Sequence, residues 1–238
     1  MDVSGKTALV TGGSRGIGAA VARALVGAGM NVVLTARQGA DAEALAAELT
    51  ASGPGRALGL ACDVRDLEAQ RRVVARAVEG FGGLDLLVAN AGVGGRAPIQ
   101  ELEPGFWHDV IGTNLTGAFY SVKASVDALV ASRGMIVTIG SLAGANFFAG
   151  GAAYNASKFG LLGFTQAVML DLREHGVRVS TIMPGSVATT FADREVTDAD
   201  AWKIDPADIA DTVLYLLRMP ARTLPSRIEV RPARTSLG

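Results

Sequence analysis

The sequence predicts an α/β fold, a single domain built on one doubly wound parallel sheet with helices on both faces. Apolar residues make up 49% of the 238 positions and glycine occurs 30 times, which suits buried parallel strands joined by tight turns. Short apolar runs alternate with amphipathic or alanine-rich helical segments along the whole chain. Because no internal repeat or low-complexity linker interrupts this alternation, we expect residues 1–238 to form one domain.

The predicted strands are short apolar runs that helical patterns separate. The strands cover residues 7–10, 31–35, 57–62, 84–89, 134–139, 177–183 and 226–230. The helices cover 40–52, 67–81, 106–114, 115–132 and 206–219, with an alanine-rich segment ending at 28 and a segment through 154 and 158 toward 175. Glycine and proline mark the boundaries, since Gly29 stops the first helix and Gly53-Pro54-Gly55 stops the second.

Composition argues against several classes of partner. The formal net charge of -1 does not suggest nucleic acid or an acidic membrane. No apolar run approaches the roughly 20 residues of a membrane-spanning helix, and the polar start of the chain enters a strand without room for a signal peptide. Cys62 is the only cysteine, so no internal disulfide is possible, and we expect it to be a packed core residue. His108 and His175 have no ligand-like spacing, so no metal site is predicted, and we expect a soluble, cytoplasmic protein.

A glycine-rich loop follows the first strand. It reads Thr11-Gly12-Gly13-Ser14-Arg15-Gly16-Ile17-Gly18, and a helical pattern follows it. Between a strand and a helix, such glycines let main-chain N–H groups approach a pyrophosphate, and the helix N-terminus adds unpaired donors and a favourable dipole. A generic glycine turn is the alternative interpretation. The flanking strand and helix favour dinucleotide binding.

Two arginines indicate which dinucleotide is bound. In NAD sites an acidic residue about 20 positions after the glycine motif holds the ribose 2′-hydroxyl. Here Arg37 stands nineteen residues after Gly18, with no carboxylate beside it, and Arg15 lies in the glycine loop itself. Two guanidinium groups converging there would suit a 2′-phosphate, which takes charge-assisted bidentate hydrogen bonds. Either arginine could simply be solvated, but together they favour NADP.

The ends of the later strands carry further candidate residues. Asp63-Val64 follows the third strand, where a carboxylate could meet an adenine amino group. Asn90-Ala91-Gly92 follows the fourth, where small residues allow close approach of the main chain to a cofactor or to the neighbouring strand. Ser141 follows the fifth strand and Pro184-Gly185 ends the sixth. Ligands of open parallel sheets bind outside these carboxyl ends.

Tyr154 and Lys158 are four residues apart, so a helix places them on one face. A phenol has a pKa of about 10 and is a poor proton donor near neutral pH. We expect the neighbouring ammonium to lower the pKa of Tyr154, and the Ser141 hydroxyl to hydrogen-bond the reacting oxygen. A core tyrosine beside a solvated lysine is the alternative, and the glycine loop is what favours the catalytic interpretation.

Asn114 is unusual within helical sequence because its side chain competes for main-chain hydrogen bonds. A kink facing a buried water and a simple helix boundary are equally compatible with its spacing. Residues 143–151 are small and apolar apart from Asn146, and their Ala143, Phe147 and Phe148 are candidate walls of a substrate pocket, or else core or interface residues. Residues 186–203, with Phe191, have the character of a mobile lid over the pocket or of an ordinary surface loop.

Four motifs in this chain resemble those of the short-chain dehydrogenase/reductase family. They are Thr11-Gly12-x-x-x-Gly16-Ile17-Gly18, Asn90-Ala91-Gly92, Ser141 with Tyr154-x-x-x-Lys158, and Pro184-Gly185. Each is weak alone, but all four occur in the family's order, at a predicted strand end or on the expected helix, and they span most of the chain. The resemblance implies a Rossmann-type sheet of about seven strands, with a cofactor half over about 1–135 and a catalytic and substrate half over about 136–238.

The resemblance also implies roles for individual residues. The catalytic tetrad would be Asn114, Ser141, Tyr154 and Lys158, in which Asn114 holds a water in a proton relay through Lys158. The residues implied to contact NADP(H) are Gly12, Ser14, Arg15, Gly16, Ile17, Gly18, Arg37, Asp63, Val64, Asn90, Ala91, Gly92, Tyr154, Lys158, Pro184, Gly185, Val187 and Thr189. Thr189 would bond the nicotinamide carboxamide, and Val187 would lie near that ring.

The implied activity is hydride transfer between NADP(H) and a small carbonyl compound or secondary alcohol. A 3-oxoacyl thioester reductase, acting on acyl-carrier-protein or CoA substrates, is the alternative, although the helix ends at Ser132-Arg133 and His175 are only partly basic. A regulator that binds NADP without turnover is disfavoured because Tyr154 and Lys158 are intact. A homodimer or homotetramer through the two long helices is expected, with the choice left open by Ile228–Pro232, which replaces the Gly-rich C-terminal segment of many relatives.

Overall fold

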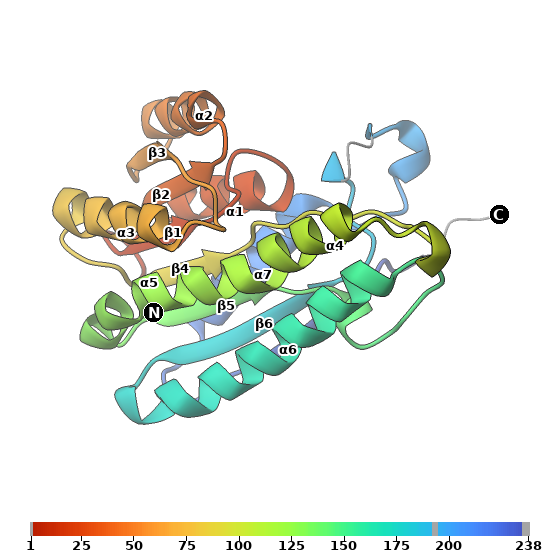
Figure 1. The fold of residues 1–238 in the computed structure, drawn as a ribbon. Helices are drawn as coiled ribbons and strands as arrows, with labels where there is room; N and C mark the ends of the chain where they lie inside the picture. Colours follow the sequence, from red (N-terminus) through yellow and green to blue (C-terminus); the bar gives the residue numbers. More distant parts are fainter. Residues whose placement is uncertain (1, 192–194, 235–238) are drawn as a thin grey trace.

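Seven parallel strands form the centre of the molecule in the computed structural model, which describes residues 2–191 and 195–234. The strands are β1 (Thr7–Val10), β2 (Asn31–Ala36), β3 (Ala57–Ala61), β4 (Leu86–Ala89), β5 (Met135–Ile139), β6 (Arg178–Pro184) and β7 (Arg227–Val230). Their order across the sheet is β3-β2-β1-β4-β5-β6-β7 (Figure 1). The predicted doubly wound parallel sheet is therefore confirmed. Every residue of β1, β4 and β5 is buried, which explains why these strands read as continuous apolar runs rather than alternating ones.

Helices cover both faces of the sheet. They are α1 (Gly16–Gly27), α2 (Gly39–Ser52), α3 (Leu67–Phe81), α4 (Pro104–Ile111), α5 (Gly117–Ser132), α6 (Ala152–Leu172) and α7 (Pro206–Arg218). One buried cluster joins α1, α2 and α7 to one face of the sheet, and a second cluster joins α3, α5 and α6 to the other face. The two long helices α5 and α6 run side by side in front of the sheet in Figure 1.

The chain reverses its winding direction between β1 and β4. From β1 it builds outward through β2 to β3, and it then returns to add β4 beside β1 and to continue outward to β7. At such a reversal the loops after the two adjacent strands diverge, which leaves a crevice at their carboxyl ends. The glycine loop follows β1 and Asn90 follows β4, so both predicted cofactor segments lie at this crevice.

One helix boundary differs from the prediction. The expected break between helices at 106–114 and 115–132 does not exist, because residues Gly112–Thr116 form a π-helical turn that links α4 directly to α5. Asn114 therefore lies in a local irregularity of the helix and not at a helix boundary, while the buried water expected beside it stays a prediction. The other boundaries agree within a few residues; for example, β3 ends at Ala61 rather than Cys62, and β4 begins at Leu86 rather than residue 84.

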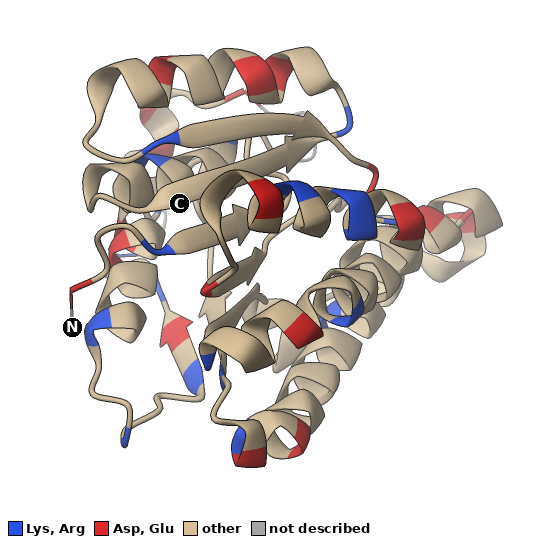
Figure 2. Cartoon of the chain, turned by 90° about the vertical axis from the view of Figure 1, so that its left-hand side faces the viewer, with Lys and Arg blue, Asp and Glu red and all other residues tan. Residues whose placement is uncertain are grey.

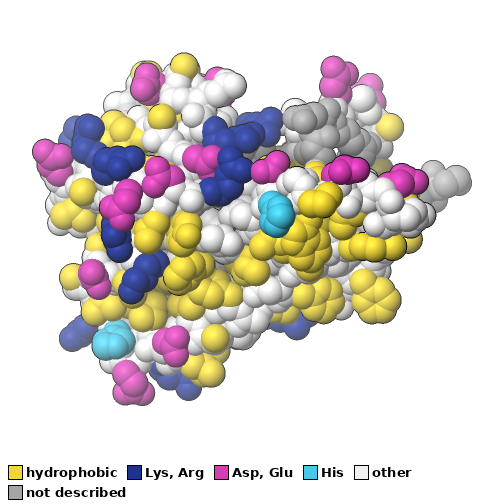
Figure 3. Space-filling model, viewed as in Figure 1, with side chains coloured by type: hydrophobic (Ala, Val, Ile, Leu, Met, Phe, Trp, Pro, Cys, Tyr) yellow, Lys and Arg dark blue, Asp and Glu magenta, His cyan; other side chains and the backbone are white. Residues whose placement is uncertain are grey.

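Surface charge is spread rather than concentrated. Lysines, arginines, aspartates and glutamates are scattered over the outer helices and loops (Figure 2), as a net charge of -1 leads one to expect. Hydrophobic side chains, in contrast, gather on the face that α4, α5 and α6 present in Figure 3. Within residues 2–191 and 195–234, no helix combines the length and the hydropathy needed to cross a membrane.

Candidate active site

Helix α6 and the end of β5 bring Ser141, Tyr154 and Lys158 together. Ser141 caps the short helical turn after β5, and its side chain hydrogen-bonds the Tyr154 hydroxyl. Lys158 is only 5% exposed, and its Nζ donates to the carbonyl oxygen of Ile139 at 3.0 Å. The same Nζ lies 5.7 Å from the centre of the Tyr154 ring. The serine, tyrosine and lysine predicted from the sequence therefore form one cluster at the carboxyl edge of the sheet.

Burial controls the protonation of this cluster. Desolvation raises the pKa of Tyr154 above its ordinary value, and the hydrogen bond with Ser141 lowers it by less. The same desolvation lowers the pKa of Lys158 from its ordinary 10.5 to about 8. The expectation that Lys158 depresses the pKa of Tyr154 is wrong for this arrangement, because desolvation by burial dominates and raises that pKa.

Asn114 is fixed by three hydrogen bonds. Its Oδ1 accepts from the Val93 N–H at 2.8 Å, and its Nδ2 donates to the Val93 carbonyl at 2.9 Å and to the Ser157 hydroxyl at 3.0 Å. The side chain is 1% exposed. The π-helical turn carries this amide away from the helix axis, so that Asn114 ties α5 both to the loop after β4 and to helix α6 beside Tyr154.

Two residues inside the Tyr-x-x-x-Lys segment support the site and were missed at the sequence level. Ser157 donates to the Tyr154 carbonyl at 2.8 Å while it accepts from Asn114. Asn155 donates to the carbonyls of Ala143 and Asn146, both at 2.7 Å, which fastens the loop after Ser141 onto α6. The sequence does show that Asn155 and Ser157 are polar residues beside Tyr154 and Lys158. Their hydrogen-bond partners Ala143, Asn146 and Asn114 are remote in sequence, so the contacts could not be predicted.

The glycine loop has the shape of a cofactor cradle. A Cβ atom on Gly12 would lie 2.9 Å from Ala91 Cα, and one on Gly18 would lie 2.2 Å from the Gly12 carbonyl oxygen, so neither position accepts a side chain. Gly16 has a φ of 54°, which favours glycine. Helix α1 has no side-chain cap and no acidic residue in its first turn, so its N–H donors remain available to a phosphate. These residues fit a dinucleotide pyrophosphate.

Asn90 and Thr11 hold this loop against the end of β4. Asn90 Nδ2 donates to the carbonyls of Thr11 and Gly12 at 2.9 and 3.0 Å. Thr11 Oγ1 in turn accepts from the main-chain N–H groups of Asn90 at 3.1 Å and of Ala91 at 3.2 Å. Asn90 thus braces the cradle through its side chain. Gly92 lies farther along the same loop, where a Cβ would sit 3.3 Å from Asn114 Oδ1 and 3.9 Å from Lys158 Nζ.

The residues expected near the adenosine differ from one another in exposure and in hydrogen bonding. Arg15 and Arg37 are both exposed, and Arg37 is near enough to Asp63 to help lower the pKa of that carboxyl group. The main cause of that lowered pKa is Arg65, which donates to both carboxylate oxygens of Asp63 at 2.7–3.1 Å. The carboxylate predicted to meet adenine is therefore already paired. The Val64 side chain is buried against Gly117, and the Val64 carbonyl accepts from Gln70 Nε2 at 2.7 Å.

The segment after β6 returns to the glycine loop. Gly185 N–H donates to the Val230 carbonyl at 2.8 Å, which secures Pro184-Gly185 beside β7. Thr189 packs against Gly16, where a Cβ would lie 3.3 Å from the threonine Cγ2. Val187 forms an isolated parallel bridge with Ile204, so the two ends of the expected lid are joined. Residues 192–194 of that expected lid lie outside the described residues.

The expected pocket walls divide into two groups. Phe191 lies beside Tyr154, with ring centres 6.1 Å apart, and Ala143 is buried two residues after Ser141. Phe148 is half-buried, and the guanidinium of Arg96 stacks on its ring at 4.6 Å from the centre. Phe147 is 86% exposed and thus does not enclose the site from this position.

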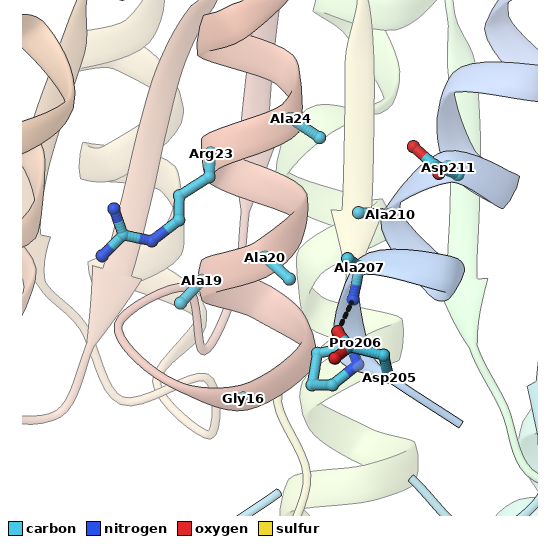
Figure 4. A pocket seen from close by; sticks show the side chains of 10 residues that line it. All are labelled: Gly16, Ala19, Ala20, Arg23, Ala24, Asp205, Pro206, Ala207, Ala210 and Asp211. Carbon is cyan, nitrogen blue, oxygen red and sulfur yellow. Dashed lines mark hydrogen bonds between the residues drawn. The ribbon is translucent and has the colours of Figure 1, made fainter. Parts of the chain in front are cut away.

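A separate hollow of about 610 Å³ lies between α1 and α7. Alanines from both helices make up half of its lining residues, and Gly16 closes one end (Figure 4). Two of its polar neighbours have other partners: Arg23 pairs with Glu48, and Asp205 accepts from the Ala207 N–H at 2.8 Å as the cap of α7. This hollow contains none of the reactive side chains. Within the described residues, no group of three or more His, Cys, Asp or Glu is arranged to hold a metal.

Comparisons with known proteins agree with this geometry. Residues 6–200 match the family model for short chain dehydrogenase. Over 192 residues the chain is 40% identical to trans-4-hydroxycyclohexanecarboxylate dehydrogenase from Sinomonas cyclohexanicum, covering 79% of this chain and 74% of that protein. Over 226 residues it is 34% identical to a 3-oxoacyl-(acyl-carrier-protein) reductase from Vibrio harveyi, covering 91% of each.

A solved structure shows the same relationship. A metagenomic short-chain oxidoreductase in complex with NADP has a TM-score of 0.86 at 39% identity, covering 99% of this chain and 100% of that one. The sheet order, the glycine cradle and the Ser–Tyr–Lys cluster all lie within the aligned region. The chain therefore belongs to the short-chain dehydrogenase/reductase family of oxidoreductases.

Proposed function

We propose that this protein is an NADP(H)-dependent oxidoreductase that interconverts a small carbonyl compound and the corresponding secondary alcohol. The observation that carries the proposal is the cluster of Ser141, Tyr154 and Lys158 beside a glycine cradle that excludes side chains. The nicotinamide cofactor, when bound, supplies or accepts the hydride. Side chains of this protein are proposed to transfer the proton and to position the substrate.

Tyr154 is proposed to donate a proton to the substrate oxygen during reduction and to remove it during oxidation. Ser141, which hydrogen-bonds the phenol, would hold the same oxygen against it. Lys158, with a pKa near 8, exchanges its proton readily around neutral pH and would restore the proton of Tyr154 while it bonds the nicotinamide ribose. Asn114 would hold a water that links Lys158 to solvent.

NADP is proposed as the preferred cofactor because two arginines and no carboxylate stand at the positions that would meet the ribose 2′ group. Arg15 and Arg37 are exposed, and no ion pair engages either of them within residues 2–191 and 195–234. NADP is also bound in the solved relative. A free guanidinium favours a 2′-phosphate over a 2′-hydroxyl.

Two further points belong to the proposal. The Vibrio harveyi relative acts on 3-oxoacyl groups attached to a carrier protein, so a 3-oxoacyl thioester is the second candidate substrate. A homodimer or homotetramer through α5 and α6 is proposed from the apolar side chains exposed on that face, with Phe119 and Phe159 each 43% exposed and Leu170 59% exposed.

Cofactor oxidation by the purified protein tests the proposal. NADPH and NADH are compared against an acetoacetyl thioester, a diketone, an aromatic aldehyde and a cyclic ketone. Turnover with NADPH on any of these supports the reductase, and the best substrate chooses between simple carbonyls and thioesters. Tight NADPH binding without turnover of any compound would favour a non-catalytic regulator.

A further inference from the structure

Two loops meet in front of the site through Arg96 and Phe148. Arg96 lies in the loop after β4, and Phe148 lies in the loop after β5. The guanidinium carbon is 4.6 Å from the centre of the Phe148 ring, close enough for the two planes to stack. The next residue, Ala97, donates its N–H to the Gly150 carbonyl at 2.9 Å, so a main-chain bond fastens the loops beside this contact.

Both partners of this contact are anchored next to the catalytic tyrosine. Gly94 lies so near Tyr154 that a Cβ would be 3.3 Å from the Cε2 atom of the ring. Arg96 is two residues farther along, and two extended residues span at most about 7 Å. Phe148 packs on Gly151, three residues before Tyr154, with its Cε2 at 2.7 Å from a Cβ built there. Arg96 thus belongs to the same loop segment that passes the Tyr154 ring, and its aromatic partner packs at the start of the helix that carries Tyr154.

The guanidinium of Arg96 has donors to spare. In the described part of the chain it makes no hydrogen bond and no ion pair, although Arg23, Arg65 and Arg227 each donate to a carboxylate. Stacking on Phe148 occupies the face of the guanidinium and leaves its edge of N–H groups exposed. That edge matches the two oxygens of a carboxylate. The ring beneath it restricts the rotamers of Arg96, so binding costs less side-chain entropy.

We propose that Arg96 is a substrate-specificity residue that binds a carboxylate of the substrate, so that oxo acids and hydroxy acids are the preferred substrate class. The carboxylate lies several bonds from the carbon that exchanges the hydride, because Arg96 approaches the substrate from the loop after β4 and Tyr154 approaches it from α6. This inference rests on the proposed carbonyl reductase activity and adds the charge of its substrate.

Matched substrates and matched variants test the assignment. The substrates are 4-oxopentanoate and 3-acetylbenzoate, each paired with its uncharged methyl ester, with NADPH as reductant. The variants are Arg96→Gln, Arg96→Lys and the control Arg56→Gln. Arg56 is also exposed, and its guanidinium also lies over an aromatic ring, 5.3 Å from the centre of Phe81. It precedes β3, so it lies at the amino ends of the strands, opposite the carboxyl ends where the site is.

The wild type is expected to prefer each acid over its ester. Arg96→Gln should lower kcat/KM for the acids by about 10- to 100-fold, mostly through KM, because it removes a charge-assisted contact. It should leave the esters within about twofold of the wild type. Arg96→Lys should retain part of the preference, since an ammonium keeps the charge without the bidentate fork, and Arg56→Gln should behave as the wild type.

The opposite results separate two failures. The role of Arg96 is overturned if the wild type reduces the esters with the same kcat/KM as the acids. It is also overturned if Arg96→Gln lowers kcat/KM equally for both. Either result leaves the reductase activity standing. An absence of turnover with every carbonyl compound, charged or neutral, overturns the reductase and this inference together.

Discussion

Lys158 Nζ lies 5.7 Å from the centre of the Tyr154 ring and bonds the Ile139 carbonyl at 3.0 Å. The lysine is therefore held by the main chain of β5 and does not depend on the tyrosine for its position. Because the two residues are anchored independently, each can be replaced without displacing the other. This makes their contributions separable by mutation.

Replacing Tyr154 by phenylalanine is expected to remove the proton donor and to leave the pocket intact. A positioned proton donor typically contributes about 10²- to 10⁴-fold to the rate, so kcat should fall at least by that factor. NADPH affinity, measured by fluorescence titration, should stay close to the wild-type value. Turnover at more than a tenth of the wild-type rate would remove Tyr154 from the proton-transfer role.

Lys158→Met is expected to stabilise the protein at neutral pH. Burial lowers the pKa of Lys158 from 10.5 to about 8, which corresponds to about 3 kcal/mol of unfolding free energy. The Ile139 carbonyl loses its donor in the variant and offsets part of this gain, so we expect about 1–3 kcal/mol in urea titrations at pH 7.

The size of this effect falls as pH rises. Below pH 8 the folded and unfolded chains both carry the proton, and the folded chain bears the full cost of burying it. Between about pH 8 and 10.5 the folded chain releases the proton while the unfolded chain keeps it, so the wild type recovers stability as pH rises. A stability difference between wild type and Lys158→Met that is the same at pH 7 and pH 10 would contradict this account.

Asn114→Asp is expected to destabilise the junction of α4, α5 and α6. A carboxylate still accepts from the Val93 N–H, but it cannot donate to the Val93 carbonyl or to the Ser157 hydroxyl. Leaving these buried acceptors unpaired should cost about 1–3 kcal/mol and lower the melting temperature. Ser157→Ala, which removes only one of the three contacts, is the matched control and should cost less.

Arg15 and Arg37 are expected to set the cofactor preference. Replacing either by alanine should lower kcat/KM for NADPH by about 10-fold or more, because a charge-assisted contact to the 2′-phosphate is lost. The value for NADH should change little. Arg23→Ala is the control, since Arg23 lies on α1, which begins directly after Arg15, but pairs with Glu48. Equal use of both cofactors by the wild type would contradict the arginine argument and leave the catalytic one untouched.

Phe119→Glu is expected to dissociate the proposed oligomer. Phe119 is 43% exposed on α5 and contacts Phe164 of α6 edge to face, so a charge there would enter the centre of the proposed interface. Sedimentation velocity should show a smaller species than for the wild type. Tyr215→Glu is the control, since Tyr215 lies on α7 and is 51% exposed. This variant should sediment as the wild type does if α5 and α6 form the main contact.

Local features of the site could be predicted from the sequence because their causes are local. Tyr154 and Lys158 share a helix face by spacing alone, and Gly16 and Gly18 stand where a strand gives way to a helix. The order of short apolar runs was enough for the doubly wound sheet. These inferences needed only periodicity and the chemistry of adjacent residues.

Features that depend on remote contacts could not be predicted. The pKa of Tyr154 follows from the burial that α6 and the loops around it produce together, and burial outweighs the single neighbour that the sequence displays. Asn114 bonds Val93, and Arg96 stacks on Phe148, through approaches of segments that are far apart along the chain. Arg65 pairs with the carboxylate of Asp63 two residues away, and it also donates to Asp109 of α4, which is remote in sequence.

The π-helical turn at Gly112–Thr116 makes the number of residues in this stretch important for the structure. It amounts to one extra residue in an otherwise continuous helix from Pro104 to Ser132. Each helical residue turns the chain by about 100°, so deleting one residue would rotate α5 and swing Val122 and Leu129 away from the sheet. A single-residue insertion or deletion in this segment would force a choice between the anchor at Asn114 and the core beneath α5.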